Sequence, residues 1–163
     1  MNKSEKLIQK ENIEFKDSLI PLSKVEKIII HHTEEEDWDI YYTHKFHKET
    51  RKWSGIGYNF FIESGSLDGM VIEGRGFHIG AHASGYNSNS IGVCLSGNFD
   101  IHYPTEKQMD SLKKLCSFLI DKYHLSSKDI LGHRELECVT KSCPGANFNL
   151  DLFRQQLNKE FLL

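Results

Sequence analysis

The stretch Val25-Glu26-Lys27-Ile28-Ile29-Ile30-His31-His32 decides how this chain folds. A short apolar run bounded by polar residues, here Ile28–Ile30, is typical of a strand buried on both faces of a sheet. The run stops abruptly, so two histidines lie at the C-terminal end of that strand. Because successive side chains of a strand point to opposite faces, His31 and His32 cannot both face one metal without a bulge. We expect His31 to face a site and His32 to be structural.

Outward from this strand, helical and strand-like patterns alternate along the chain. In order, the sequence predicts a helix over residues 38–49, a hairpin of GYNFFIE (57–63) and GMVIEGR (69–75), a strand SIGVCLSG (90–97), a helix over 105–123, a strand DILGH (129–133) and a helix over 150–161. Thr105 and Gln108 have capping-box spacing at the start of the long helix. The loop from Gly74 to Asn89 is long enough to suggest a functional role. Interleaved strands and helices predict an α/β fold, a single domain with a central mixed β-sheet flanked by helices.

Length and composition restrict the class of protein. The chain has 163 residues, 39% of them hydrophobic, which suits one domain with its own core. Its formal net charge of -3, with both signs mixed along the sequence, argues against a nucleic-acid partner. Apolar runs are much shorter than the roughly 20 residues of a membrane span, so no membrane insertion is expected. Residues 1–24 are interpreted as an N-terminal extension that wraps the domain or is partly mobile, and residues 25–163 as the domain.

The N-terminal sequence MNKSEKLIQKENIEFKD is charged throughout and lacks the apolar segment of a secretory signal. We therefore expect synthesis in the cytoplasm, where cysteines are free thiols or metal ligands rather than disulfides. Imidazole and thiolate groups together suit zinc, and a catalytic zinc has three protein ligands and one open position. Among nine histidines and four cysteines, His31, His133 and Cys143 are the candidate ligands. Cys138 is a rival, because with His133 and Cys143 it would build a closed, structural zinc site.

The remaining histidines and cysteines have weaker support. Cys94 on a predicted strand and Cys116 on the apolar face of the long helix are interpreted as small buried hydrophobes. Trp38 and Trp53 are interpreted as core or groove-wall residues. The histidines without motif support, expected to be structural or surface residues, are His44, His47, His78, His102 and His124.

Four motifs occur in an order and approximate spacing that identify a family resemblance. They are IIIHHT (28–33), GIGYNFFI (55–62), IGAHASGYNSNSIGVCLSGNF (79–99) and GHRELECVTKSCPG (132–145). Over roughly residues 25–155 the chain resembles the zinc N-acetylmuramoyl-L-alanine amidases. This family includes phage lysozymes that are amidases, bacterial wall amidases and animal peptidoglycan-recognition proteins. The resemblance implies the peptidoglycan-recognition-protein-like amidase fold.

The resemblance also assigns roles to individual residues. It implies one Zn²⁺ per chain, bound by His31, His133 and Cys143, with Tyr58 and Lys141 as catalytic residues. Recognition proteins that bind without cutting typically replace the cysteine ligand, so Cys143 favours catalysis. A cysteine rather than an aspartate at this position is also more similar to phage-type members than to cytosolic muropeptide-recycling amidases. The loop that lines the family's substrate groove contains three candidate contacts, for which a structural role stays open: His82, Tyr86 and Asn87.

The function implied is zinc-dependent hydrolysis of the amide between N-acetylmuramic acid and L-alanine in bacterial peptidoglycan. Zinc would polarise the amide carbonyl and lower the pKa of a bound water, while Lys141 would stabilise the oxyanion and Tyr58 would orient or transfer a proton. We expect a bacteriolytic endolysin that reaches the cell wall after holin-type release. The alternatives are a non-catalytic muropeptide-binding module, a cytosolic muropeptide-recycling amidase, and a regulator of an intracellular partner built around a structural zinc.

Overall fold

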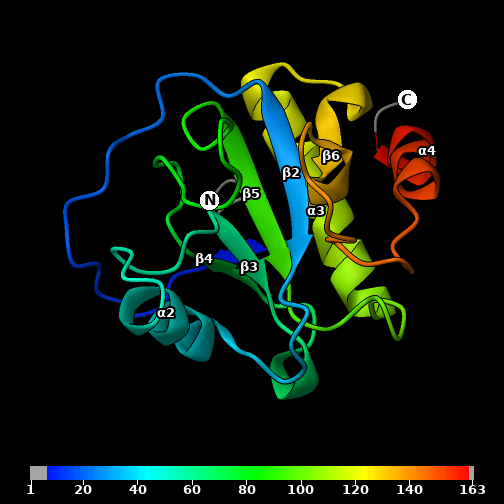
Figure 1. The fold of residues 1–163 in the computed structure, drawn as a ribbon. Coiled ribbons are helices and arrows are strands. Elements are labelled where there is room, and N and C mark those ends of the chain that lie inside the picture. Colours follow the sequence, from blue (N-terminus) through cyan, green and yellow to red (C-terminus); the bar gives the residue numbers. More distant parts are fainter. Residues whose placement is uncertain (1–6, 162–163) are drawn as a thin grey trace.

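The computed structural model describes residues 7–161, which fold around a six-stranded mixed sheet (Figure 1). The strands are β1 (Ile8–Gln9), β2 (Lys27–His32), β3 (Phe60–Ile62), β4 (Val71–Glu73), β5 (Ser90–Leu95) and β6 (Ile130–Gly132). The helices are α2 (Ile40–Glu49), α3 (Glu106–Tyr123) and α4 (Leu150–Phe161), with short 3₁₀ turns η1 (Gly65–Leu67), η2 (Ser127–Asp129) and η3 (His133–Glu135). The strand order is β1-β4-β3-β5-β2-β6; β3 and β4 are antiparallel and every other pair is parallel. The predicted α/β fold with one mixed sheet is confirmed.

Strand β2 lies between β5 and β6, as its unbroken isoleucine run predicts. Ile28, Ile29 and Ile30 are all fully buried. Ile28 and Ile30 pack into the core under α3 and α4, whereas Ile29 packs against Ala83 on the other face. By the same alternation His31 shares the face of Ile29, and His32 points to the face of Ile30. The sheet therefore separates the two histidines.

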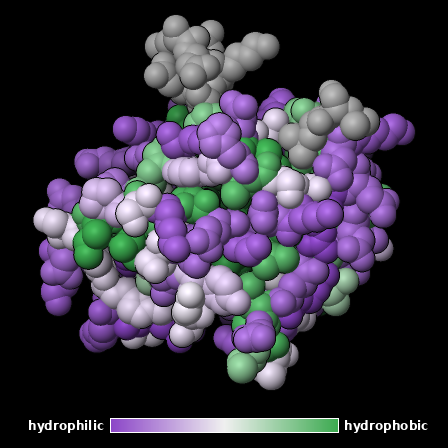
Figure 2. Space-filling view, turned by 90° about the horizontal axis from the view of Figure 1, so that it is seen from above, coloured by the Kyte–Doolittle hydropathy of each residue, from purple (hydrophilic) through white to green (hydrophobic). Residues whose placement is uncertain are grey.

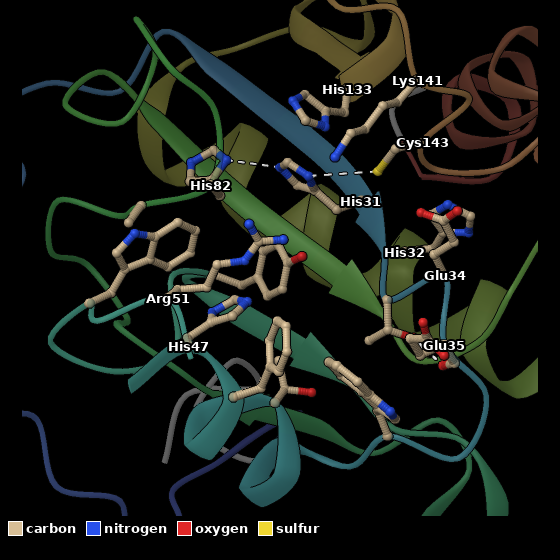
Figure 3. A pocket seen from close by; sticks show the side chains of 17 residues that line it. His31, His32, Glu34, Glu35, His47, Arg51, His82, His133, Lys141 and Cys143 are labelled. Atoms are coloured by element: carbon tan, nitrogen blue, oxygen red, sulfur yellow. Dashed lines mark hydrogen bonds between the residues drawn. The ribbon is translucent and has the colours of Figure 1, made fainter. Parts of the chain in front are cut away.

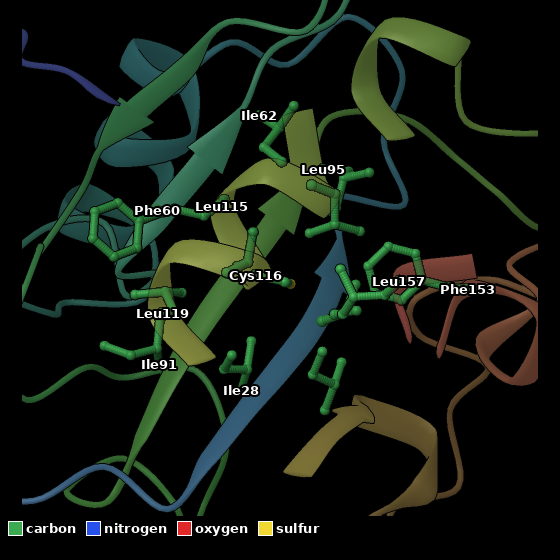
Figure 4. Packing of buried hydrophobic residues seen from close by; sticks show 14 of the residues in the cluster. Ile28, Phe60, Ile62, Ile91, Leu95, Leu115, Cys116, Leu119, Phe153 and Leu157 are labelled. Atoms are coloured by element: carbon green, nitrogen blue, oxygen red, sulfur yellow. The ribbon is translucent and has the colours of Figure 1, made fainter. Parts of the chain in front are cut away.

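The larger core lies between the sheet and the pair α3 and α4 (Figure 4). The residues labelled there are Ile28, Phe60, Ile62, Ile91, Leu95, Leu115, Cys116, Leu119, Phe153 and Leu157. A smaller cluster on the opposite face joins Ile40 of α2 to Phe61 and Cys94. Cys94 and Cys116 are both fully buried, as expected of small hydrophobes. Each face of the sheet is thus covered, and the parallel strands can be apolar on both sides.

The predicted capping box and the predicted hairpin agree with the structure. The Thr105 hydroxyl accepts from the Gln108 amide at 3.0 Å, and the Gln108 side chain accepts from the Thr105 amide at 3.1 Å, so the capping box is formed. Helix α2 begins at Ile40, two residues later than predicted, because Asp39 caps it by accepting from the Tyr42 amide at 2.8 Å. The hairpin of β3 and β4 is in place.

Residues 7–24 run along the domain, and β1 in this segment was not predicted. Ile8 pairs with Val71, so two residues too short to show a strand pattern extend the edge of the sheet. Further along, the Lys16 amide donates to the Ser54 carbonyl at 2.8 Å, and His44 Nε2 lies 3.0 Å from the Glu14 carbonyl oxygen. These contacts fasten the segment to α2 and to the chain that precedes β3. Residues 1–6 of the expected extension and residues 162–163 of the expected domain lie outside the described part.

The face of the molecule seen in Figure 2 is largely hydrophilic, with apolar residues visible in the gaps between polar ones. Within residues 7–161, none of the helices has both the length and the apolar character needed to cross a membrane.

Candidate metal centre and active site

His31, His133 and Cys143 meet at one edge of the sheet (Figure 3). Their nitrogen and sulfur ligand atoms all lie within 4.8 Å of one another, and Cys143 Sγ is 3.8 Å from His31 Nδ1. Ile30 of β2 pairs with Gly132 of β6 in parallel register, so His31 and His133, which follow these two residues, lie at the same end of the sheet. Between residues 7 and 161 this is the single group of three or more His, Cys, Asp or Glu side chains with such geometry.

Cys143 comes from a loop rather than a strand, and Arg134 holds that loop. The Arg134 amide donates to the Cys143 carbonyl at 2.7 Å. Its guanidinium donates to the carbonyl oxygens of Ser142 at 3.2 Å, Gly145 at 2.6 Å and Phe148 at 2.7 Å. Arg134 follows His133 directly. This dipeptide therefore supplies one candidate ligand, His133, and positions the loop that carries another, Cys143.

Asp100 and Gly145 hold the same loop from the opposite side. The Asp100 carboxylate accepts from the Ala146 amide at 2.8 Å and from the Ser142 hydroxyl at 2.9 Å. Gly145 has φ +115°, and a Cβ there would lie 2.6 Å from the backbone carbon of Phe99. The sequence after Cys143 therefore needs glycine both for its conformation and for its close approach to residue 99.

The protonation of the three candidate ligands fits a metal site. Burial, and then the neighbouring His82, lowers the pKa of His31 well below its usual value, while burial and then Lys141 lower that of His133. Both imidazoles are thereby neutral, which is the form that binds metals. Burial raises the pKa of the Cys143 thiol to about 12, an effect partly opposed by the backbone amide of His32. A bound dication would reverse this preference by stabilising the thiolate. Two imidazoles and one thiol, with one position left open, can hold a metal ion such as zinc.

A cavity of about 270 Å³ opens beside this group. Trp38, Phe46 and Trp53 form an apolar wall, and Glu34 and Arg51 add charges of opposite sign. The complete lining comprises His31, His32, Thr33, Glu34, Glu35, Trp38, Thr43, Phe46, His47, Arg51, Trp53, Tyr58, Ala81, His82, His133, Lys141 and Cys143. Of the two interpretations given for Trp38 and Trp53, core residue or groove-wall residue, the structure agrees with the second.

Tyr58 and Lys141, the two predicted catalytic residues, both line this cavity. The ring centroid of Tyr58 is 5.1 Å from that of His31. Burial raises the pKa of Tyr58 well above its usual value, and neighbouring thiols add to the effect. Its hydroxyl is therefore protonated at neutral pH and can donate a hydrogen bond. Figure 3 shows the Lys141 side chain extending toward Cys143 and His133, with its ammonium group near the candidate ligands.

Of the three predicted substrate contacts, the structure brings one to the cavity. His82 lines it, yet its ring nitrogens lie 2.9 Å from His31 Nε2 and 3.2 Å from the Ser90 hydroxyl. Asn87 instead accepts from the backbone amides of His82 and Ala83 at 2.8 and 2.9 Å, which closes the loop. Tyr86 packs beside the cluster around Ile29 and is not part of the cavity lining. Asn87 thus holds the loop, and Tyr86 packs under it, while their contact with substrate stays a prediction.

His47, expected to be a structural or surface residue, lines the cavity, as does Arg51, which the sequence did not single out. The Gly57 amide donates to His47 Nδ1 at 2.9 Å, so the neutral ring carries its hydrogen on Nε2. Burial, and then Arg51, lowers the pKa of His47 to about 4, which keeps the ring neutral. The sequence pattern that could have indicated them is the four-residue spacing of His47, in the last turn of α2, and Arg51, just after this helix.

The other candidates lie outside the metal group. Cys138 is exposed and is not among the clustered ligands, which leaves the closed-site alternative without support. His32 accepts from the Phe99 amide at 3.1 Å and stacks on that ring, in agreement with a structural role. His44 holds the N-terminal segment through the Glu14 carbonyl and accepts from the Ile56 amide at 2.9 Å.

The mixed sheet and the His–His–Cys group at the C-terminal ends of its strands define an α/β domain with side chains that could hold a metal ion. The family model of N-acetylmuramoyl-L-alanine amidase matches residues 21–146, and the chain belongs to this family.

Similar proteins include animal and bacterial members. The N-acetylmuramoyl-L-alanine amidase of Mus musculus is 40% identical over 110 residues, which are 65% of this chain and 20% of that protein. The chain thus spans a fifth of the length of this curated relative. The structure of the endolysin amidase LysCS from Clostridium intestinale URNW has a TM-score of 0.84 and 32% identity, covering 93% of this chain and 95% of that one. A Drosophila PGRP-LB variant in complex with tracheal cytotoxin has a TM-score of 0.75 and 26% identity, with 94% of each chain covered.

Proposed function

We propose that this protein is a zinc-dependent N-acetylmuramoyl-L-alanine amidase that cleaves bacterial peptidoglycan. The observation that carries the proposal is the group of His31, His133 and Cys143, whose ligand atoms lie within 4.8 Å of one another beside a cavity. Tyr58 and Lys141 line the same cavity. Family membership supplies the bond: the amide between the lactyl group of N-acetylmuramic acid and L-alanine. Hydrolysis adds water across this amide and gives a lactyl carboxylate and a free alanine amine.

The residues around the cavity have different roles in this reaction. His31, His133 and Cys143 would hold zinc, which when bound polarises a carbonyl and makes a water nucleophilic near neutral pH. Tyr58 keeps its proton and orients the reacting groups through its hydroxyl, so it acts as a donor rather than as a phenolate base. Lys141 places a cation where negative charge develops on the carbonyl oxygen. The apolar wall of Trp38, Phe46 and Trp53 excludes water from one side of the substrate.

Product analysis tests the bond that is cut. Purified cell walls and soluble muropeptides are digested in parallel, and free alanine amines and new reducing sugar ends are measured. We expect new amines without new reducing ends. Reducing ends alone would refute the amidase assignment.

Metal content tests the site and separates catalysis from binding alone. We expect one zinc per chain in the wild-type protein, and loss of both zinc and activity in Cys143→Ser and His133→Ala. Cys138→Ser is the matched control, because this cysteine is exposed and outside the group, and it should keep both. Wild-type protein that stayed empty after reconstitution would favour a muropeptide-binding module.

The biological setting belongs to the same proposal. The similarity to the endolysin amidase LysCS extends over nearly all of both chains and supports an endolysin that reaches the wall after holin-type release. The PGRP-LB variant bound to tracheal cytotoxin supports peptidoglycan fragments as the ligand class. We assign the amidase domain to residues 25–163 and treat residues 1–24 as its extension.

A further inference from the structure

His82 lies in the middle of a hydrogen-bonded chain that starts at a backbone carbonyl and ends at the candidate metal ligands. Its members are the Tyr86 carbonyl, the Ser90 hydroxyl, the His82 ring and the His31 ring. Ser90 Oγ lies 2.6 Å from the Tyr86 oxygen and 3.2 Å from His82 Nε2. His82 Nδ1 lies 2.9 Å from His31 Nε2, and His31 Nδ1 faces Cys143 Sγ at 3.8 Å.

The first contact fixes the direction of the whole chain. A carbonyl oxygen only accepts, so the short 2.6 Å contact requires Ser90 to donate its single hydrogen to Tyr86. The Ser90 oxygen is then an acceptor, and His82 must donate to it from Nε2. A neutral imidazole has one N–H, so His82 Nδ1 has a lone pair and accepts from His31 Nε2–H. His31 in turn presents the lone pair of Nδ1, the atom that faces Cys143.

Packing holds the His82 ring in this position. His82 is 9% exposed, and its ring lies against the backbone of β5 at Gly92. A Cβ at Gly92 would lie 2.4 Å from His82 Cγ, and one at Gly80 would lie 2.8 Å from His82 Cδ2. Two glycines thus leave the space that the ring fills. Asn87 holds the backbone amide of His82 at 2.8 Å.

We propose that His82 and Ser90 are positioning residues that set the tautomer of His31, so that its Nδ1 is free to bind the metal. The inference rests on the zinc site proposed above. Metal-binding histidines generally need a partner for the second ring nitrogen, and loss of such partners weakens metal affinity about 10–100-fold. Here the partner is itself a histidine whose hydrogen is placed by a serine that never reaches the metal. Ser90 is therefore expected to affect zinc binding from outside the cavity lining.

Two measurements on the full chain test the proposal. Two-bond ¹H–¹⁵N correlation spectra of the wild-type protein, metal-free and zinc-loaded, distinguish imidazole tautomers. We expect the Nε2–H form for both His31 and His82. A His82 ring with its hydrogen on Nδ1 would overturn the proposal, and this result needs no variant to fold.

Zinc affinity, measured by competition with a chelating dye, is the second test. We expect a loss of about 10-fold in Ser90→Ala and up to about 100-fold in His82→Phe. Ser96→Ala is the control, since Ser96 is a buried serine that follows the same strand and donates to the Trp38 carbonyl. Its affinity should equal that of the wild type. Equal affinity in Ser90→Ala would refute the relay, whereas a wild-type protein that binds no zinc would refute the metal centre instead.

Discussion

Replacing Arg134 by lysine should weaken both the fold and the metal site. The guanidinium donates to three carbonyl oxygens of the loop that carries Cys143, and an ammonium group cannot make these planar, forked contacts together. If lysine keeps one bond, two are lost. Hydrogen bonds from charged groups contribute about 1.5–3 kcal/mol each, so the partly buried site loses about 3 kcal/mol. For a chain of this size the melting temperature should fall by about 6–12 °C.

The expected loss of zinc affinity in Arg134→Lys is calculated from the same loss of hydrogen-bond energy. If the loosened loop must be ordered again when the metal binds, 3 kcal/mol corresponds to a loss of zinc affinity of up to about 100-fold. Thermal unfolding of the metal-free protein and dye competition measure the two effects separately. Thr105→Ala is the control, because Thr105 caps α3 by accepting from the Gln108 amide at 3.0 Å, and α3 carries none of the candidate metal ligands. It should lose stability and keep its zinc affinity. An Arg134→Lys protein with unchanged zinc affinity would refute the reasoning.

Three further predictions concern single side chains. Tyr58→Phe should lower kcat by about 100-fold or more, with zinc content unchanged, since it removes a positioned proton donor; release of free alanine amines measures the rate, and full turnover would contradict the role. Lys141→Met should likewise lower kcat and retain zinc, and a variant that lost the metal instead would show that Lys141 acts on the site's structure. Glu63→Gln should gain stability relative to the wild type as the pH rises, because glutamine cannot ionise. Burial raises the pKa of Glu63 from 4.5 to about 7, so its favourable contribution is complete below about pH 4.5 and is lost as the pH rises through 7. The difference in stability between the two proteins should change by about 3 kcal/mol in total, of which about 2 kcal/mol falls between pH 5.5 and 8. Urea unfolding of the wild type and the variant at these two pH values measures the change. An unchanged difference would contradict the assignment, since buried histidines such as His47 titrate in both proteins.

The elements that the sequence predicted are those in which local pattern and tertiary packing agree. The isoleucine run of β2, the capping box of α3 and the full extent of α4 needed no long-range information. Strand β1 could not be predicted, because two residues carry no pattern and its partner β4 lies about sixty residues away in the sequence. The roles of individual residues in the loop 79–90 could not be predicted either, because they depend on contacts that form only in the folded chain. Its motif marked His82, Tyr86 and Asn87 as a group, but only the folded loop shows that Asn87 bonds backbone amides while His82 faces His31.

His31 comes to the candidate metal site from a strand and Cys143 comes from a loop. This difference explains why different hydrogen bonds hold the two side chains in place. The sheet already fixes the backbone of His31, so its remaining freedom is the rotation and tautomer of one ring. A side-chain relay through His82 and Ser90 controls both. The backbone around Cys143 has no strand partner, so Arg134 and Asp100 hold it through carbonyl and amide groups. Variants of the relay should therefore change the tautomer of His31 together with metal affinity, whereas variants of Arg134 should change unfolding and metal affinity and leave that tautomer as it is.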